Sequence, residues 1–217
     1  MKRTLWIFIF LALFVAALGN FLFFEHVLNK GLNDAREKLI LIASSASRLI
    51  DADTLLKIPL RQDADKTPEY KVIFNVLERI KNANPSVKYI YIMAPTDKAG
   101  VFQYIVDADP LPDIVTAKSP TSFSGDEFDA KGVPGMLKAY DGPSADENLV
   151  IDAWGVTLTG YAPIYDNSRK VVAILCVDMD AESMRGDRGK EWARVAFAVL
   201  TGAVALFVLG RGFLIKT

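Results

Sequence analysis

The stretch VTLTGYAPIYDNSRKVVAILCVDM, residues 156–179, has the pattern of two β-strands joined by a tight turn. Two runs rich in β-branched and aromatic residues, 156–165 and 170–179, flank the polar triplet Asp166-Asn167-Ser168. Such triplets are typical of hairpin turns, because Asp and Asn side chains hydrogen-bond to nearby backbone groups. The stretch therefore predicts an antiparallel β-hairpin that completes a folded domain.

The preceding sequence contains the patterns of further strands and one clear helix. Residues 88–94 and 101–108 alternate in hydrophobicity around a turn at 97–100, and 149–154 form another short run. Residues 68–81 have helical spacing, with a proline at the first turn and Asn84-Pro85 as the stop. Between these elements lies a Pro- and Gly-rich segment, 110–135, with a short helix expected at 133–140. The predicted fold is α+β, with helices packed on an antiparallel sheet of about five strands.

Two uncharged apolar runs bracket this domain, Leu5–Phe24 and Val195–Gly210. A bilayer core about 30 Å thick needs about twenty helical residues, so both runs are predicted to be transmembrane helices. Basic residues lie before the first run and after the second, which places both termini in the cytoplasm. A cleaved signal peptide is the alternative for the first run, but the run is longer than the apolar core of such peptides.

The predicted organisation follows from these runs. It comprises a cytoplasmic N-terminus and first membrane helix (1–24), a juxtamembrane helix (25–51), an extracytoplasmic domain (52–184), and a linker, second membrane helix and short tail (185–217). The juxtamembrane helix carries a heptad pattern, which fits either packing against its own domain or a parallel homodimer seam. The apolar positions of this pattern are Leu28, Leu32, Ala35, Leu39, Ile42, Ala46 and Leu49.

Composition limits the chemistry of the central domain. Between Glu25 and Trp192 there are 26 acidic and 20 basic residues, a net charge of −6 that does not attract nucleic acid. The single cysteine, Cys176, excludes an internal disulfide, and the only histidine, His26, lies at a membrane boundary. Neither a catalytic triad nor a zinc site can be built from this set. We therefore expect no enzyme activity and no cofactor, while an unspecialised metal site on the acidic loops stays open.

Four segments together resemble the Cache domains of bacterial transmembrane receptors, which are PAS-like sensors placed outside the membrane between two spans. The resemblance covers roughly residues 34–184 and is most specific in the last two segments. Cys176 departs from it, because related sequences usually carry glycine there. The segments are NPSVKYIYIMAP (84–95), FQYIVDADP (102–110), IDAWGVTLTGYAPIYD (151–166) and VVAILCVDMD (171–180).

The resemblance implies a sensor in the bacterial inner membrane whose periplasmic domain binds a small molecule and passes a conformational signal through its membrane helices. Receptors of this kind continue into a cyclase, kinase, phosphodiesterase or chemotaxis module, whereas this chain stops about seven residues after its second span. Two alternatives therefore stay open. The chain is the input half of a receptor whose output module or signalling partner is separate, or it is a membrane interaction subunit without a signalling role.

Strand alternation divides the predicted sheet into two faces. One face is apolar and should pack on the helices; it includes Ile90, Ile92, Phe102, Tyr104, Val106, Ile151, Leu158, Leu175 and Val177. The other face mixes aromatic, hydroxyl and carboxylate side chains, together with Gln103 and Ile105, which suits a small polar ligand covered by segment 110–135 as a lid. Because neighbouring buried carboxylates repel each other, a ligand with an amine, or a metal ion, is favoured. The predicted ligand-binding residues are Tyr91, Asp107, Asp152, Trp154, Tyr161 and Asp178.

The same residues have structural roles as alternatives. Asp107 can shape the end of its strand, as Asp does in turns. Trp154 and Tyr161 can be core aromatics whose polar tips have protein partners. Asp152 and Asp178 lie in strands, where Asp is disfavoured, and this cost favours a role in binding.

Overall fold

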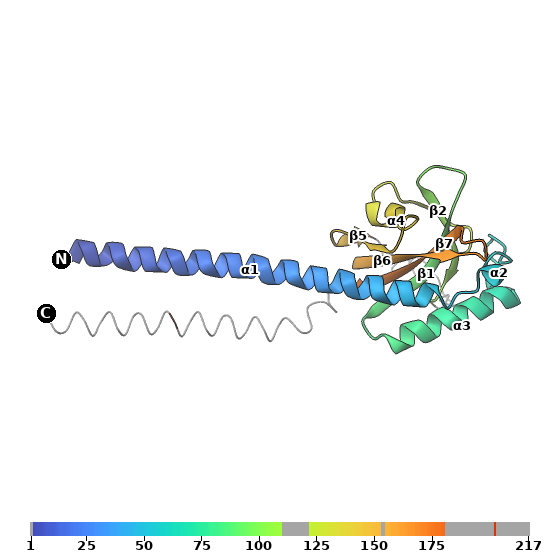
Figure 1. The fold of residues 1–217 in the computed structure, drawn as a ribbon, viewed down its shortest axis with the longest axis horizontal. Coiled ribbons are helices and arrows are strands. Elements are labelled where there is room, and N and C mark those ends of the chain that lie inside the picture. Colours follow the sequence, from blue (N-terminus) through green and yellow to red (C-terminus); the bar gives the residue numbers. More distant parts are fainter. Residues whose placement is uncertain (1, 110–121, 153–154, 181–201, 203–217) are drawn as a thin grey trace. The chain divides into compact units, whose positions relative to one another are not determined.

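The computed structural model describes residues 2–109, 122–152, 155–180 and 202 (Figure 1). The chain divides into two units, of which Asp34–Ser183 is the compact body that carries the sheet. Met1–Asn33 and Met184–Thr217 make up the other unit. The second predicted membrane span lies outside the described residues apart from Gly202. Trp154 and residues 110–121 of the predicted lid also lie outside them.

A seven-stranded antiparallel sheet forms the centre of the body, in the order β3-β2-β1-β7-β6-β4, with β5 paired to β6. The prediction of about five strands was therefore too low. The two additional strands, β3 and β4, have three and two residues, too few to show any periodicity in the sequence. The strands are β1 Val87–Pro95, β2 Val101–Asp107, β3 Glu127–Asp129, β4 Ser144–Ala145, β5 Val150–Asp152, β6 Gly155–Tyr165 and β7 Val171–Asp180.

The predicted hairpin is formed by β6 and β7, paired along almost their whole length. Its turn is held by the Asp166 carboxylate, whose Oδ1 accepts hydrogen bonds from the backbone N–H groups of Ser168 and Lys170, both at 2.9 Å. Arg169 takes a positive φ of 64°, which closes the turn. The polar triplet thus acts as the sequence indicated.

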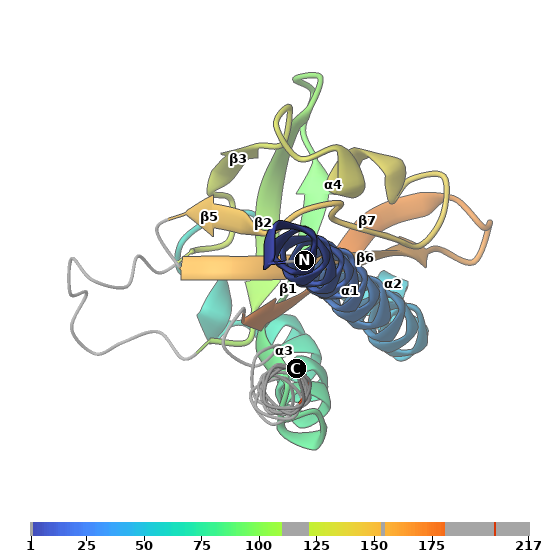
Figure 2. The ribbon, with the colours of Figure 1, turned by 90° about the vertical axis from the view of Figure 1, so that its left-hand side faces the viewer.

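Helices cover both faces of the sheet. α3, Pro68–Ala83, begins at the Thr67 cap, whose Oγ1 accepts a hydrogen bond from the backbone N–H of Tyr70, and extends two residues beyond the prediction. Figure 2 shows α3 and the short helix α4, Pro134–Lys138, on opposite sides of the sheet. The remaining helices are α1 Lys2–Ser47, α2 Ala52–Leu55 and the 3₁₀ turn η1 Ala64–Lys66.

α1 packs its C-terminal part on the sheet, which explains much of the heptad pattern. Ala35, Leu39 and Ala46 are buried, with Leu39 completely inaccessible, whereas Leu49 is 64% exposed. Arg36 adds a polar contact, because its Nε donates a hydrogen bond to the Asp146 carbonyl oxygen at 2.9 Å. These positions therefore serve packing within the chain, and a dimer seam stays a prediction.

The predicted juxtamembrane boundary at residue 25 lies within α1, which is one continuous helix from Lys2 to Ser47. In the part of the chain that the structure describes, no helix is both long enough and apolar enough to cross a membrane.

The face toward α1 and α3 is the apolar one predicted, with Ile90, Ile92, Leu158, Leu175 and Val177 inaccessible to solvent. Three assignments were wrong. Ile151 is 80% exposed, because β5 lies off the main path of the sheet. Phe102 and Tyr104 instead belong to a buried cluster with Met93, Tyr161 and Cys176 on the other face.

A β-bulge explains the error in β2. Ile92 pairs with Val106 but Met93 pairs with Tyr104, so Ile105 is an extra residue without a partner in β1. A bulge shifts the alternation by one residue. Beyond it, Phe102 and Tyr104 face the same side as Asp107, whereas Gln103 faces the other.

Candidate functional site

The strand register places four of the six predicted ligand-binding residues on the sheet face opposite α1 and α3. One row crosses five strands through directly paired residues, in the order Ser144, Tyr161, Cys176, Tyr91 and Asp107. The next row pairs Thr159 with Asp178. Because directly paired residues share a face, Tyr91, Asp107, Tyr161 and Asp178 point to one side.

Tyr91 lies at the centre of this face between an aromatic and an acidic neighbour. Its hydroxyl donates a hydrogen bond to Asp178 Oδ1 at 3.4 Å, and its ring centroid lies 5.5 Å from that of Tyr104. Burial, and next the negative charge of Asp178, raise the pKa of Tyr91 well above its usual value. Tyr91 therefore stays a neutral hydrogen-bonding phenol over the physiological range.

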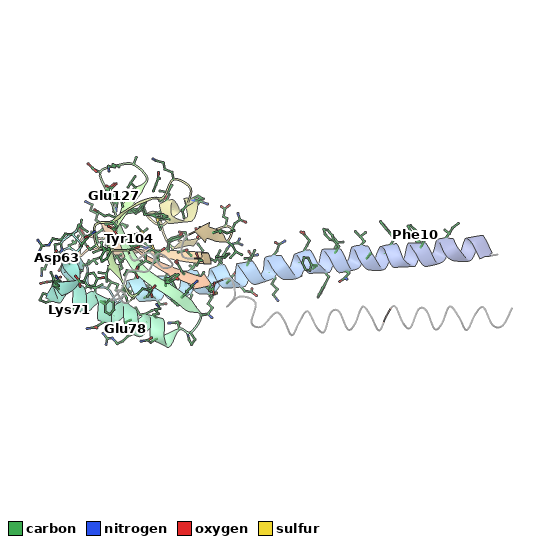
Figure 3. All side chains as sticks on the ribbon, turned by 180° about the vertical axis from the view of Figure 1, so that it is seen from behind. Phe10, Asp63, Lys71, Glu78, Tyr104 and Glu127 are labelled. Atoms are coloured by element: carbon green, nitrogen blue, oxygen red, sulfur yellow. The ribbon has the colours of Figure 1, made fainter. Side chains whose placement is uncertain are left out.

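Tyr104 reaches the site only because of the bulge, so alternation in the sequence missed it. It is 9% exposed, and its hydroxyl interacts with the Ser122 side chain. Burial raises its pKa above the usual range. Figure 3 shows Tyr104 among the side chains of the sheet. The Tyr91 and Tyr104 rings are thus neighbours on the face of the candidate site.

Asp107 ends β2 and is held from both sides. Its Oδ1 accepts the backbone N–H of Asp109 at 2.9 Å, while the Tyr70 hydroxyl on α3 donates to its carbonyl oxygen at 3.4 Å. Asp109 forms an ion pair with Lys81. Burial raises the pKa of the Asp107 carboxyl to about 7, the hydrogen bond from Asp109 opposes this rise, and the Asp109 charge adds to it. Asp107 therefore shapes the end of its strand, as the sequence alternative proposed, through the hydrogen bond from Asp109. Its carboxyl group is at the same time strongly desolvated.

Tyr161 has a protein partner that sequence reasoning missed. Its hydroxyl donates to Asp146 Oδ1 at 3.0 Å, and Asp146 Oδ2 accepts the backbone N–H of Thr159 at 3.2 Å. Tyr161 is 2% exposed and Asp146 4% exposed, although residues 143–148 have the composition of a solvated polar loop. Burial raises the pKa of the Asp146 carboxyl. Tyr161 is therefore a core aromatic residue whose hydroxyl has a protein partner, which was the alternative considered from the sequence. The position of Asp146 beside it follows from the pairing of β4 with β6 and could not be predicted from the sequence.

Three carboxylates influence the centre of the face. The Cys176 thiol is completely buried, and its pKa is raised first by burial and then by the negative charges of Asp178, Asp146 and Asp107. The centre of this face is therefore a desolvated environment with carboxyl groups nearby.

Residues from the segment 122–140 pack on this face of the sheet. β3 pairs with the outer edge of β2, placing Phe128 opposite Phe102. Met136 of α4 is buried in the same cluster, and Val133 and Tyr140 pack against it. Of the predicted lid, 110–135, residues 110–121 lie outside the described residues; in the described part, Phe128 and Val133 pack against the cluster, and a lid role stays a prediction.

The two remaining predicted residues stay predictions. Asp152 ends β5, opposite Gly155 of β6, but its side chain is outside the described set, as is Trp154. Among the described residues, no group of three His, Cys, Asp or Glu side chains is placed to hold a metal ion.

A second surface feature is a groove of about 660 Å³ between α1 and α3. Apolar side chains, including Leu41, Leu49, Val76 and Ile80, form most of its lining, and Arg79 is its only charged residue. It lacks the convergent polar groups that orient a small ligand. We therefore place the candidate binding site on the opposite face of the sheet.

The chain matches no family model and no curated protein. Several solved structures resemble it at low sequence identity. The ligand-binding domain of the Campylobacter jejuni chemoreceptor Tlp3, solved with L-valine, is 12% identical, with a TM-score of 0.47 over 74% of this chain and 58% of that one. The sensor domain of the V. cholerae histidine kinase DctB is 16% identical, with a TM-score of 0.48 over 75% and 54%.

The periplasmic sensory domain of the Campylobacter jejuni chemoreceptor Tlp1 is 11% identical, with a TM-score of 0.39 over 69% of this chain and 55% of that one. This chain thus spans a little over half the length of the structures that it matches. The three structures are, respectively, a ligand-binding domain of a chemoreceptor, a sensor domain of a histidine kinase and a periplasmic sensory domain of a chemoreceptor.

Proposed function

We propose that this chain is an extracytoplasmic sensor that binds a small cationic molecule on the sheet face opposite α1 and α3. The observation that carries the proposal is the strand register, which places Asp107 and the buried Asp178 on the same side of the sheet as Tyr91. Burying several carboxylates is unfavourable unless protons or a cation neutralise them. A bound ammonium group relieves that cost, which gives the site its selectivity.

The aromatic side chains support the same ligand chemistry. Tyr91 and Tyr104 present adjacent ring faces, 5.5 Å apart between centroids, beside Asp178. Ring faces attract ammonium ions, and the attraction increases when water is excluded. In this proposal Asp178 and Asp107 supply charge, and the two phenols supply contact area and hydrogen bonds. Asp152 and Trp154 are assigned to the same site from the sequence pattern.

A thermal-shift screen of the full chain in detergent tests the site. Amines, amino acids, simple carboxylates and divalent cations are the ligand classes to compare, because a ligand that binds the native state raises the melting temperature. We expect amines to give the shift and Asp178→Asn to remove it. Asp141→Asn is the matched control, since the Asp141 carboxylate is exposed to solvent.

Two outcomes would contradict the proposal. If a carboxylate without an amine binds and Asp178→Asn abolishes it, the location holds but the charge argument fails. If an amine binds equally well to the Asp178→Asn variant while that variant stays folded, the site lies elsewhere.

We also propose that the N-terminal part of α1 anchors the chain in a membrane and that α1 transmits the signal. Large apolar side chains between Ile7 and Phe24 are exposed along this helix, including Phe10 at 74% (Figure 3), and lipid is the solvent that favours such a surface. α1 continues from this segment to Leu39 on the sheet. A ligand with different affinity for two arrangements of α1 would shift their populations.

Reporter fusions test the topology. Fusions at Asp129 and at the C-terminus should report opposite compartments, because the sequence places the body outside and both termini inside. The same compartment signal from both fusions would show that the two-span topology is wrong.

A further inference from the structure

Arg36 of α1 holds the loop that follows β4. Its Nε donates a hydrogen bond to the Asp146 carbonyl oxygen at 2.9 Å, and its Nη2 donates to the Glu147 carbonyl oxygen. Arg36 precedes Leu39 by three residues, so both side chains lie on the same side of the helix, and Leu39 packs against Gly160 of β6. α1 is therefore attached at two neighbouring points to the end of the sheet where β6 and β4 pair.

Asp146 lies at the edge of the sheet, where a connection between its two faces can pass. It directly follows β4, the last strand in the sheet order, and it is buried. Its carbonyl oxygen accepts from Arg36, whereas its Oδ1 accepts the Tyr161 hydroxyl at 3.0 Å and its Oδ2 accepts the Thr159 backbone N–H at 3.2 Å. Its own backbone N–H donates to the Thr159 carbonyl oxygen at 2.9 Å. One buried residue thus bonds to α1 on one side and to β6 on the other.

The strand register leads from Asp146 to Asp178, which supplies charge to the proposed cation site. Thr159, which exchanges hydrogen bonds with Asp146, pairs directly with Asp178 of β7. Neighbouring strands lie about 4.8 Å apart, so Asp146 and Asp178 are two strand spacings, or about 10 Å, apart along this row. Arg36 of α1 is thus connected to the candidate binding face through hydrogen-bonded backbone.

Close packing around Asp146 makes this connection rigid. A Cβ atom added to Gly135, at the start of α4, would be 2.8 Å from Asp146 Oδ1 and 3.0 Å from the Ala145 carbonyl oxygen. Ser144 Oγ also donates a hydrogen bond to the Gly135 carbonyl oxygen at 2.7 Å. The Asp146 carboxylate therefore has little room to leave its partners unless the loop moves with it, and close-packed contacts of this kind transmit displacements.

We propose that Arg36 is a positioning residue that couples α1 to the ligand-binding face through Asp146. This inference rests on the proposed function and names the contact through which the site and α1 affect each other. Because α1 lies on the opposite face of the sheet, Arg36 acts on the site only through other residues. Coupling between two sites is reciprocal. Loss of the Arg36 hydrogen bonds should therefore weaken binding at Asp178, and a ligand at Asp178 should stabilise the contact of α1 with the sheet.

A double-mutant cycle on the affinity for n-butylamine tests the coupling, measured by calorimetry on the full chain in detergent. Asp146→Asn is the second substitution, because an amide has one acceptor oxygen whereas the carboxylate accepts through both. We expect Arg36→Gln alone to weaken binding about fivefold, and to have no further effect when Asp146→Asn is present. Arg36→Lys, which keeps a donor for one carbonyl oxygen, should have an intermediate effect. Lys38→Gln, at an exposed position of the same helix, should leave the affinity unchanged.

The reciprocal effect is measured on the native chain, so it does not depend on whether a variant folds. Saturating n-butylamine should slow amide hydrogen exchange about twofold or more in residues 34–47 of α1, because it stabilises their contact with the sheet. The same addition should have no effect on Asp178→Asn. Unchanged exchange in this segment while n-butylamine binds the native chain would overturn the coupling.

The outcomes separate this inference from the proposed function. If n-butylamine does not bind the native chain, the proposed cation site fails and the inference fails with it. If it binds at Asp178 but Arg36→Gln lowers only the melting temperature and not the affinity, the proposed function stands and Arg36 has a structural role alone. If the effects of Arg36→Gln and Asp146→Asn on affinity add, Arg36 does not act through Asp146, and the inference is wrong.

Discussion

Leu39 of α1 lies so close to Gly160 of β6 that a Cβ atom added to Gly160 would be 2.6 Å from the Leu39 Cβ. The same added atom would be 2.8 Å from the Leu39 carbonyl carbon, so helix backbone as well as side chain is in the way. The helix can approach the sheet this closely only where a residue lacks a side chain. Gly160 pairs directly with Val177 of β7. The Leu39–Gly160 contact therefore connects α1, through β6, to the strand that carries Cys176 and Asp178.

Gly160→Ala should therefore destabilise the protein by about 1–3 kcal/mol, the usual cost of overpacking a core. Gly132→Ala is the control, because a Cβ there meets nothing within 4 Å. Urea unfolding of the two variants measures the difference. Equal midpoints would show that α1 does not pack on β6 at this point.

Tyr161→Phe should cost about 1–3 kcal/mol of unfolding free energy, although only one oxygen atom is removed. The reason is that Asp146 Oδ1 loses the hydroxyl at 3.0 Å in a place that water does not reach. Tyr165→Phe removes an exposed hydroxyl and should be nearly neutral. If both substitutions have the same effect on the urea midpoint, the Asp146–Tyr161 hydrogen bond does not stabilise the fold.

A homodimer, if formed through α1, should use a different face of the helix from the one the heptad pattern suggested. Leu39 is completely buried in its own chain, whereas Leu41 is 68% exposed and lines the groove between α1 and α3. Single cysteines at Leu41 and Ser45 should therefore crosslink between chains more than one at Leu39, measured after mild oxidation in membranes or detergent. The Cys176→Ala background removes the native thiol. Equal crosslinking at all three positions would argue against a specific dimer through this helix.

Much of the fold could be predicted from the sequence because its longest elements have clear periods. The runs that became α3, β1, β6 and β7 show the spacing of a helix or the alternation of strands over at least seven residues. The hairpin turn was also evident, since its Asp side chain performs the local hydrogen bonding that such turns require. Strand alternation then placed Tyr91, Asp107, Tyr161 and Asp178 on one face correctly.

The features that were missed depend on contacts between distant segments. Ile105 is an ordinary β-branched residue, so nothing in the sequence marks it as the extra residue of a bulge, yet it moves Tyr104 into the site. Asp146 lies in a polar stretch and is buried only because β4 pairs with β6 beside Tyr161. The Tyr140 hydroxyl, just after the five-residue helix α4, is buried without a hydrogen-bond partner among the described residues. The sequence does not show this, because it depends on which residues surround Tyr140 in space.

The stability of the protein should depend on pH through the Asp107 carboxyl group. The Asp107 carboxyl has a pKa of about 7 in the folded protein, compared with 3.8 for an ordinary aspartate, chiefly because it is buried. Between about pH 4 and pH 7 the folded state therefore binds more protons at this position than the unfolded state. Stability must fall as pH rises through this window, by about 3 kcal/mol in total from this group, and then level off.

Asp107→Asn should remove this decline, because the amide resembles the protonated carboxyl in shape and never acquires a charge. The Asp146 carboxyl, whose pKa burial also raises, contributes in the same direction in both proteins, so only the difference between native chain and variant reports on Asp107. Urea unfolding at pH values from 4.5 to 7.5 measures it, with Asp141→Asn as the exposed control. Parallel curves for the native chain and Asp107→Asn would show that Asp107 is ionised throughout. A cationic ligand should also bind more tightly as pH rises through about 7, because it pairs with the ionised carboxylate, and this gain should be absent in Asp107→Asn.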